Sequence, residues 1–351
     1  GEEVIAEITD ITAKFARGNA IEIIKAAPER VTAPCELAKP GGCGGCDFQH
    51  IEIGAQRKMK SAIVKEQFSR IAKMDVEVDV IGIEPKDGFG WRTRMDFTVS
   101  PDRKLALYGA RSHNLIPIGK CLIADQRMDL DAINQIKLPA GAKVEVAISK
   151  SGKQYVAIEG RENFDLIAES VLGKDFSISP TSFWQSHVQA PSELTKSVLI
   201  NLEIRPGDHV FDLYGGVGLF TAAIASAVTE TGRVTLIELD AGAITDARRI
   251  FADEPLVEIV EGKVERSLSK FKRADLILLD PPRSGAGREV VAAMVKLEPR
   301  SIVYVSCDPA SLARDATYLE TSGYKLAGLQ SFDLFPMTQH IECVARFLKS
   351  P

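Results

Sequence analysis

The sequence predicts an α/β protein with a mostly parallel, doubly wound sheet in its C-terminal half and a mainly antiparallel β region before it. After about residue 175, short apolar runs alternate with helix-like segments, which is typical of parallel strands covered by helices on both faces. Between about residues 80 and 160, apolar residues instead recur with a period of two, as in strands with one buried face. The predicted C-terminal strands lie in the runs HVFDLYGG, RVTLIELD, LVEIVEG, ADLILLDPP, SIVYVSC and ECVARFLK.

The first 32 residues alternate in hydrophobicity over the stretches EEVIAEITDI and NAIEIIKAA. This pattern predicts two or three short strands, which are too few to bury a core of their own. The sequence also starts with glycine instead of methionine. We therefore expect residues 1–32 to be part of a small, truncated β domain.

The segment 55–73 follows a glycine-rich loop and has the pattern of a helix. It carries six basic residues and a single acid, Glu66. Such a surface is either a solvated helix face or a contact surface for nucleic acid, and the sequence leaves both open. The basic residues are Arg57, Lys58, Lys60, Lys65, Arg70 and Lys73.

The antiparallel region is best defined in two stretches. In WRTRMDFTV, residues 91–99, the apolar side chains share one face and two arginines lie on the other. The run KVEVAISKSGKQYVAIEG predicts a β-hairpin that turns at Ser151 and Gly152.

Composition restricts the class of protein. The chain has 351 residues, of which 45% are hydrophobic, enough for two or three domain cores. A net charge of −5 argues against a generic nucleic-acid coat protein but allows a local basic groove. The sequence shows no apolar run of about 18 residues and no signal-peptide pattern, so we expect a cytoplasmic protein that does not bind membranes. The six cysteines then predict metal or catalytic roles instead of disulfides.

A glycine-rich turn follows the first predicted C-terminal strand. Gly215, Gly216 and Gly218 allow a ligand to approach the backbone closely, although their spacing differs from the dinucleotide fingerprint. The second strand ends at Glu238, where a carboxylate can accept hydrogen bonds from ribose hydroxyls. The fourth strand ends at Asp280, in a DPPR motif whose alternative reading is an ordinary turn.

This order of motifs resembles class I S-adenosylmethionine-dependent methyltransferases. The resemblance implies that residues 212–218 hold the methionine part of the donor and that Glu238 holds its ribose. It also places Asp280 at the carboxyl end of a strand, where such sheets bind their ligands.

The stretch YVSCDPASLARD places Cys307 between a buried strand and a helix that starts near Asp308 and Pro309. A buried cysteine is usually a small apolar filler. At a helix N-terminus, however, the helix dipole favours a thiolate, although the charge of Asp308 opposes it. Beside a methyl donor, a thiolate suggests uracil as the acceptor, because its carbon 5 becomes nucleophilic only after a thiolate adds to carbon 6.

Such a reaction also needs a base that removes the proton from carbon 5. The stretch FDLFPMTQHIE offers His340 and Glu342, just before the last strand. The competing interpretation is a polar strand entry followed by a buried Cys343.

The motifs SPTSFWQSH, DLYGGVG, DPPRSG, YVSCDPASLARD and FPMTQHIE resemble, in this order, the RNA uracil-5-methyltransferase family. The match covers essentially the whole chain, and the last three motifs are the most specific. The resemblance implies that Cys307 is the nucleophile and Glu342 the proton-abstracting base. Because the target uridine must reach the thiol edge-on, we also predict that it leaves its stack. The remaining implied contacts are Gln185, Tyr214, Gly216, Glu238 and Asp280 for S-adenosylmethionine, and Phe183 and Arg283 for the RNA.

Four further cysteines lie upstream, at Cys35, Cys43, Cys46 and Cys121. Their spacing alone fits a zinc ion or an iron–sulfur cluster equally well. The ribosomal-RNA branch of the family carries a [4Fe–4S] cluster on three clustered cysteines and a distant one, and this chain resembles that branch. A structural cluster is therefore expected, with zinc as the alternative.

The resemblance implies three domains: a partial OB or TRAM-like segment over 1–32, a central RNA-binding domain with the cysteines over 33–175, and a methyltransferase domain over 176–351. The expected substrate is 23S ribosomal RNA, and no obligate protein partner is implied. The alternatives are uridine methylation in transfer RNA, cytosine-5 methylation of RNA, and a non-catalytic iron–sulfur protein that binds RNA.

Overall fold

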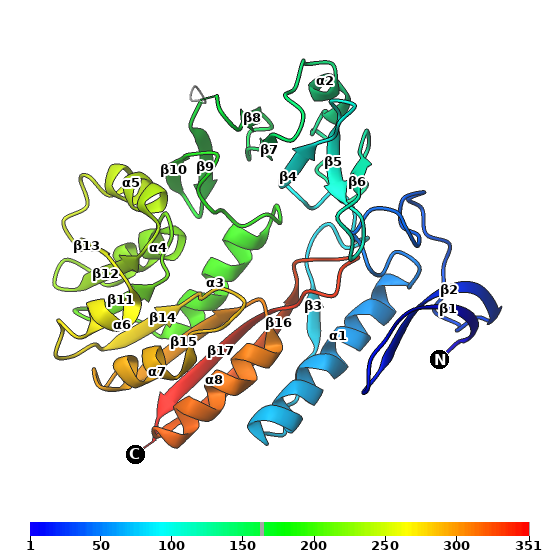
Figure 1. Cartoon of the computed structure of the whole chain (residues 1–351). Coiled ribbons are helices and arrows are strands. Elements are labelled where there is room, and N and C mark those ends of the chain that lie inside the picture. The colour runs from blue at the N-terminus through cyan, green and yellow to red at the C-terminus, as the bar shows by residue number, and fades with distance from the viewer. Residues whose placement is uncertain (162–164, 351) are drawn as a thin grey trace.

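The fold comes from a computed structural model that describes residues 1–161 and 165–350 (Figure 1). The chain starts with a hairpin of β1 (Glu3–Ile11) and β2 (Ala16–Lys25), which pair antiparallel and keep nearly all their residues exposed. These are two of the two or three strands predicted there, and they enclose no core of their own.

The largest element is a mixed sheet of eight strands in the order β13-β12-β11-β14-β15-β17-β16-β3. The first five strands in this order, from β13 through β12, β11 and β14 to β15, run parallel to one another. Strand β17 lies between β15 and β16 and is antiparallel to both. The strands are β3 (Val80–Gly82), β11 (His209–Leu213), β12 (Arg233–Glu238), β13 (Val257–Glu261), β14 (Leu276–Leu279), β15 (Ser301–Ser306), β16 (Tyr324–Asp333) and β17 (Glu342–Lys349).

Helices cover both faces of this sheet, as expected for a doubly wound fold (Figure 1). One buried cluster joins the sheet to α3 (Ala190–Leu202), α4 (Leu219–Ala227) and α5 (Ala241–Ile250). The cluster on the opposite face contains side chains from the remaining helices of this half and from the first helix of the chain. These helices are α1 (Ile53–Gln67), η1 (Phe68–Ala72), α6 (Val264–Leu268), α7 (Gly287–Val295) and α8 (Pro309–Thr321).

The middle of the chain forms a five-stranded antiparallel sheet in the order β6-β5-β4-β7-β8, with a separate core that includes α2 (Leu130–Asn134). Its strands are β4 (Arg94–Val99), β5 (Leu105–Tyr108), β6 (Leu115–Pro117), β7 (Lys143–Ile148) and β8 (Gln154–Ile158). A second hairpin, β9 (Ile167–Val171) and β10 (Lys174–Ile178), leads to the large sheet.

The predicted fold class is confirmed. All six predicted C-terminal strands form, and the hairpin turns between β7 and β8 as expected. The sequence missed β16 and β3, which extend the sheet beyond β17. The domain boundaries after residues 32 and 175 stay a prediction, and two of the predicted domains include residues 162–164 and 351, which lie outside the described residues.

The first turns of the basic helix are neither a solvated face nor a contact surface for nucleic acid, the two interpretations that the sequence left open. Lys60 is fully buried and its ammonium lies 2.7 Å from the carboxylate of Asp333, which Arg57 also contacts at 3.1 Å. These two cations therefore belong to the interior instead of a solvated or RNA-binding face. The reason is that Asp333, at the end of β16, is far away in sequence and adjacent in space.

None of the helices in the described parts of the chain has the length and apolar character needed to cross a membrane.

Candidate active site

Cys307 follows β15 directly and precedes α8. Asp308 is the N-cap of this helix, and its carboxylate accepts a hydrogen bond of 2.7 Å from the backbone N–H of Ser311. Cys307 is half-buried and lies at the carboxyl edge of the parallel strands. The strand and the helix start predicted around this cysteine are both present.

Glu342 is the first residue of β17 and lies beside Cys307. Ser306 pairs with Cys343 across the antiparallel strands β15 and β17. Cys307 follows Ser306 and Glu342 precedes Cys343, so both residues lie at the same edge of the sheet. Glu342 is only 3% exposed. Burial, and then the charge of Asp280, raise the pKa of Glu342 well above its ordinary value.

Asp280 directly follows the neighbouring strand, β14, and completes a group of three at the strand ends that we call the strand-end site: Asp280, Cys307 and Glu342. The side-chain amide of Gln185 donates a 3.4 Å hydrogen bond to the Asp280 carboxylate. Burial, followed by the nearby charge of Asp212, raises the pKa of Asp280 to about 7.

The pKa of Cys307 is raised to about 11. Burial is the main cause, the charges of Glu342 and Asp280 add to it, and Arg283 opposes them. The expectation that the helix N-terminus would favour a thiolate is therefore outweighed in the free protein. The two carboxyl groups that oppose ionisation of Cys307, those of Glu342 and Asp280, belong to other strands. From the sequence, only the adjacent Asp308 was expected to oppose it.

The glycine turn between β11 and α4 has the conformation that a close ligand requires. Tyr214 and Gly216 have φ values of 60° and 56°, and Gly218 has 92°. A Cβ atom at Gly218 would lie 2.3 Å from the ring of Phe251, so only glycine fits there. The backbone N–H of Gly216 donates a 3.0 Å hydrogen bond to the carboxylate of Glu238, which ends β12.

A cavity that opens to solvent lies over this turn. Four of the five predicted donor contacts line it: Gln185, Tyr214, Gly216 and Asp280. Glu238 adjoins it through Gly216, and its carboxylate also accepts hydrogen bonds from the backbone of Leu239 and Asp240. The turn and this carboxylate fit an adenosyl donor, because they present open backbone and a ribose acceptor side by side.

The two predicted RNA contacts are both exposed, and one of them, Phe183, lies at this cavity. Phe183 lines the cavity and is 70% exposed, an arrangement suited to stacking on a base. Arg283 is exposed and contacts the His340 ring at 3.2 Å. Cys307, Glu342 and Arg283 do not line the cavity of Gln185 and Tyr214.

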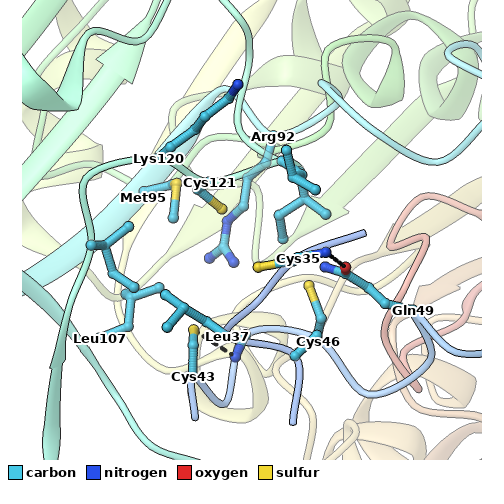
Figure 2. Close-up of a pocket in the computed structure, with 15 residues that line it drawn as sticks. Cys35, Leu37, Cys43, Cys46, Gln49, Arg92, Met95, Leu107, Lys120 and Cys121 are labelled. Atoms are coloured by element: carbon cyan, nitrogen blue, oxygen red, sulfur yellow. Dashed lines mark hydrogen bonds between the residues drawn. The ribbon is translucent and has the colours of Figure 1, made fainter. Parts of the chain in front are cut away.

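The four upstream cysteines line one cavity (Figure 2). Figure 2 shows the guanidinium of Arg92 pointing into the same cavity. Burial raises the pKa of Cys43 and of Cys121, and Arg92 opposes the rise for both. Among the described residues, however, no three cysteine, histidine or acidic side chains lie close enough together to form a ready metal site.

Residues that the sequence analysis did not single out support the strand-end site. The buried carboxylate of Asp315 accepts hydrogen bonds from the backbone of Ala286 and Gly287 and from the Tyr304 hydroxyl. These contacts hold the loop that follows Asp280. The available signal was the LARD sequence at residues 312–315, whose acid lies eight residues after Cys307 on a helix that is otherwise buried along this face.

The chain is similar to known RNA methyltransferases. The family described as tRNA (Uracil-5-)-methyltransferase matches residues 143–350. A protein of Streptomyces avermitilis described as an uncharacterized RNA methyltransferase is 37% identical, with 98% of this chain and 90% of that protein covered. A similarly described protein of Bifidobacterium longum is 31% identical, with 96% and 86% covered.

One solved structure shares the fold over nearly the whole length. It is the tRNA (uracil-54, C5)-methyltransferase of Pyrococcus abyssi in complex with S-adenosyl-L-homocysteine. The TM-score is 0.79, with 22% identity, 99% of this chain and 93% of that chain covered.

Proposed function

The chain belongs to the tRNA (uracil-5-)-methyltransferase family of RNA methyltransferases, and from that membership we propose that it methylates one uridine through a covalent bond between Cys307 and the base. Membership makes the protein an S-adenosylmethionine-dependent RNA (uracil-5-)-methyltransferase. The observation that supports the covalent route is the strand-end site, where a thiol and two carboxyl groups come together at the carboxyl edge of the sheet.

Cys307 starts the reaction as the thiolate, after its thiol has lost its proton. The sulfur adds to carbon 6 of uracil, and the electron pair of the carbon 5–carbon 6 double bond moves toward carbon 5 and the carbonyl at carbon 4. The bound donor supplies an electrophilic methyl group on a positively charged sulfur. Carbon 5 forms the new carbon–carbon bond to this methyl group as the methyl–sulfur bond of the donor breaks.

Glu342 completes the reaction. Its carboxylate takes the proton from carbon 5, the double bond reforms, and the bond from carbon 6 to Cys307 breaks, which releases the thiolate. The raised pKa of Glu342 makes its carboxylate a stronger base than an ordinary glutamate. Arg283 lowers the pKa of Cys307, so it favours the thiolate that attacks and leaves.

The donor is held by Gln185, Tyr214, Gly216, Glu238 and Asp280 in this proposal. Four of these line the cavity over the glycine turn, and Glu238 offers its carboxylate next to it. Phe183 stacks on the extruded uracil, and Arg283 contacts the RNA backbone. The exposed positions of both side chains support these roles.

The proposed RNA is 23S ribosomal RNA, and the supporting observation is the set of four cysteines that line one cavity. Their thiols suit a [4Fe–4S] cluster, because thiolates are its usual ligands and Arg92 places a positive charge beside them. Zinc is the alternative. Iron and sulfide analysis of protein purified without oxygen decides between them, and zinc alone would contradict the cluster.

Transfer RNA is the second candidate substrate, and the description of the matching family favours it. The experiment supplies labelled S-adenosylmethionine with 23S ribosomal RNA or transfer RNA transcripts and separates the nucleosides after digestion. We expect 5-methyluridine in ribosomal RNA with the native protein and none with Cys307→Ala. Methylation of transfer RNA alone would overturn the substrate, and 5-methylcytidine would overturn the reaction.

A further inference from the structure

The proton-abstracting Glu342 follows a loop that has no regular structure of its own. Residues 334–341, here called the base loop, connect the end of β16 to the start of β17. Met337, in the middle of this loop, has a φ of 65°, a conformation that a residue with a side chain adopts only when its surroundings impose it. The surroundings of Met337 therefore determine how the base loop enters β17.

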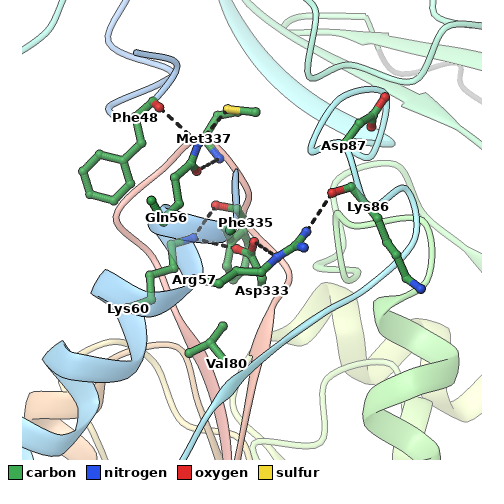
Figure 3. A network of polar contacts seen from close by, with 12 residues as sticks. Phe48, Gln56, Arg57, Lys60, Val80, Lys86, Asp87, Asp333, Phe335 and Met337 are labelled. Atoms are coloured by element: carbon green, nitrogen blue, oxygen red, sulfur yellow. Dashed lines mark hydrogen bonds and ion pairs between the residues drawn. The ribbon is translucent and has the colours of Figure 1, made fainter. Parts of the chain in front are cut away.

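Those surroundings come from residues 47–60, which start directly after Cys46 (Figure 3). The carbonyl oxygen of Met337 accepts hydrogen bonds from the backbone N–H groups of Asp47 and Phe48, at 2.8 Å and 3.0 Å. A third hydrogen bond between the two segments, of 3.1 Å, is donated by the backbone N–H of Gln339 to the carboxylate of Asp47.

Gln56 contacts both segments at once. Its amide oxygen accepts a 3.1 Å hydrogen bond from the N–H of Met337, and its amide nitrogen donates to the carbonyl oxygens of Phe48 and Ile51. Gln56 is completely buried, so water does not replace these bonds if they are lost. One turn further along α1, the ammonium of Lys60 donates a 3.0 Å hydrogen bond to the carbonyl oxygen of Phe335 (Figure 3).

The side chain of Met337 links the base loop to the cysteines. It is 5% exposed and packs in one apolar cluster with Trp91 and Ile123, against which Cys46 and Cys121 also lie. Movement of these two cysteines would therefore alter the packing of Met337 and the position of Asp47 at the same time.

We propose that Asp47 and Gln56 are positioning residues for Glu342, and that the four-cysteine site keeps them in place through Cys46. This inference rests on the proposed covalent mechanism. The step that it affects is proton abstraction, because the base loop leads directly into Glu342, whereas Cys307 is carried by the junction of β15 and α8. Loss of the positioning contacts would therefore slow release of the methylated base and leave its formation unchanged.

The experiment measures two rates with RNA bound to the native full chain and its variants. Covalent trapping by 5-fluorouridine RNA with S-adenosylmethionine reports addition and methyl transfer, because fluorine cannot leave as a proton does. Release of 5-methyluridine from normal RNA reports proton abstraction. If native protein does not trap the fluorinated RNA, the proposed function fails, and that result is separate from the comparison of variants.

Asp47→Ala removes one hydrogen-bond acceptor from an exposed position, so the variant should fold. We expect release to slow about three- to tenfold, the worth of one hydrogen bond, with trapping unchanged. Asp47→Asn keeps an oxygen that accepts from Gln339 and should restore release. Gln56→Leu should slow release about 10- to 100-fold and make the methylated covalent adduct accumulate. Glu66→Ala, on the exposed side of the same helix, is the control.

Two outcomes would overturn the positioning role. In one, trapping and release fall together in Asp47→Ala and Gln56→Leu, as they would if these residues only supported folding. In the other, release stays at the native rate in both variants.

The link to the cysteines has its own measurement. In Cys46→Ser, the backbone amides of Met337 and Gln339 should exchange hydrogen faster, while those of β11 and β14 keep their protection. Unchanged exchange at Met337 and Gln339 would overturn the link, and so would an equal loss of protection in β11 and β14.

Discussion

The strand-end site and the cysteine cavity are built in opposite ways. Asp280, Cys307 and Glu342 each sit where a strand of the large sheet ends or starts, so the pairing of β14, β15 and β17 brings them together. Cys35, Cys43 and Cys46 lie in residues 33–50, where the structure has no helix or strand of several residues and Cys43 makes one isolated bridge to Gly109. The first site is organised by the backbone, whereas the second, in our proposal, is organised by the metal group that its thiols bind.

This difference explains why the strand-end site is already arranged for its chemistry, whereas the cysteines are not arranged to bind a metal. The strand-end site has strongly shifted pKa values because buried strands hold its carboxyl groups close to the thiol. The cysteines share a cavity but are not yet at ligand distances from one another. A bound metal group would supply the free energy that orders such a loop.

Removal of the nucleophile is the strongest test of the strand-end side of this comparison. Cys307→Ala should lower methyl transfer by about 10⁴-fold or more, since no other group at this edge can form the bond to carbon 6. The measurement is incorporation of labelled methyl groups into RNA. Thermal unfolding should stay close to native, because Cys307 is only half-buried. Appreciable methyl transfer by the variant would show that the thiol is not the nucleophile.

Replacement of the base separates the two halves of the reaction. Glu342→Gln should slow release of product by about 10²- to 10⁴-fold and leave a methylated adduct on the protein. It also removes a negative charge that raises the pKa of Cys307, so that pKa should fall. The pH profile of Cys307 alkylation measures this shift, and a profile moved to higher pH would contradict the electrostatic account.

Removal of the iron of the proposed cluster tests the other region. Chelation, or Cys43→Ser, should lower Tm by about 5–10 °C and increase hydrogen exchange within residues 33–50. The strands that carry Asp280 and Cys307 should keep their protection, because their pairing does not involve the cysteines. An equal Tm with and without iron would mean that the cysteine region is organised by the chain alone.

The smallest expected effect is a pH dependence of donor binding. Burial raises the pKa of Asp280 to about 7, so its carboxylate forms only as pH rises through neutrality. If this carboxylate binds the ammonium group of the donor, Kd for S-adenosylhomocysteine should fall about tenfold between about pH 6 and 8. Isothermal titration at several pH values measures it, and Asp280→Asn should bind more weakly without this dependence. A native Kd that is flat with pH would contradict the assignment.

The same proton affects stability in the opposite direction. Because folded Asp280 binds its proton more tightly than unfolded Asp280, its contribution is stabilising below the ordinary aspartate pKa. That contribution is lost as pH rises to about 7. Asp280→Asn should therefore flatten part of the decline in unfolding free energy over this range.

The comparison also shows what the sequence can predict. Apolar runs such as SIVYVSC and ECVARFLK are local signals, and they place Cys307 and Glu342 at the ends of strands. Strand order is not local, and the entry of β17 between β15 and β16 was not predicted. The pKa of Cys307 depends on that order, because the carboxyl groups that raise it come from other strands.

Residues whose partners are distant in the chain were misread or missed. Lys60 belongs to a helix with every sign of an exposed basic face, and its burial depends on Asp333, 273 positions later. Gln56 carries no sequence signal at all, since its role arises from Met337 on another element. In both cases the decisive contact joins the first helix to the last part of the chain, at the end of β16 for Lys60 and in the base loop for Gln56.

The most direct test of the central claim is to trap the protein on RNA that contains 5-fluorouridine at the target position. After digestion with protease and nuclease, mass spectrometry identifies the peptide that carries the nucleotide. The account predicts a methylated fluorouridine joined to Cys307, and no adduct when S-adenosylmethionine is present with Cys307→Ala. A stable adduct on any other residue, or methylation of normal RNA with no adduct on the fluorinated one, would contradict it.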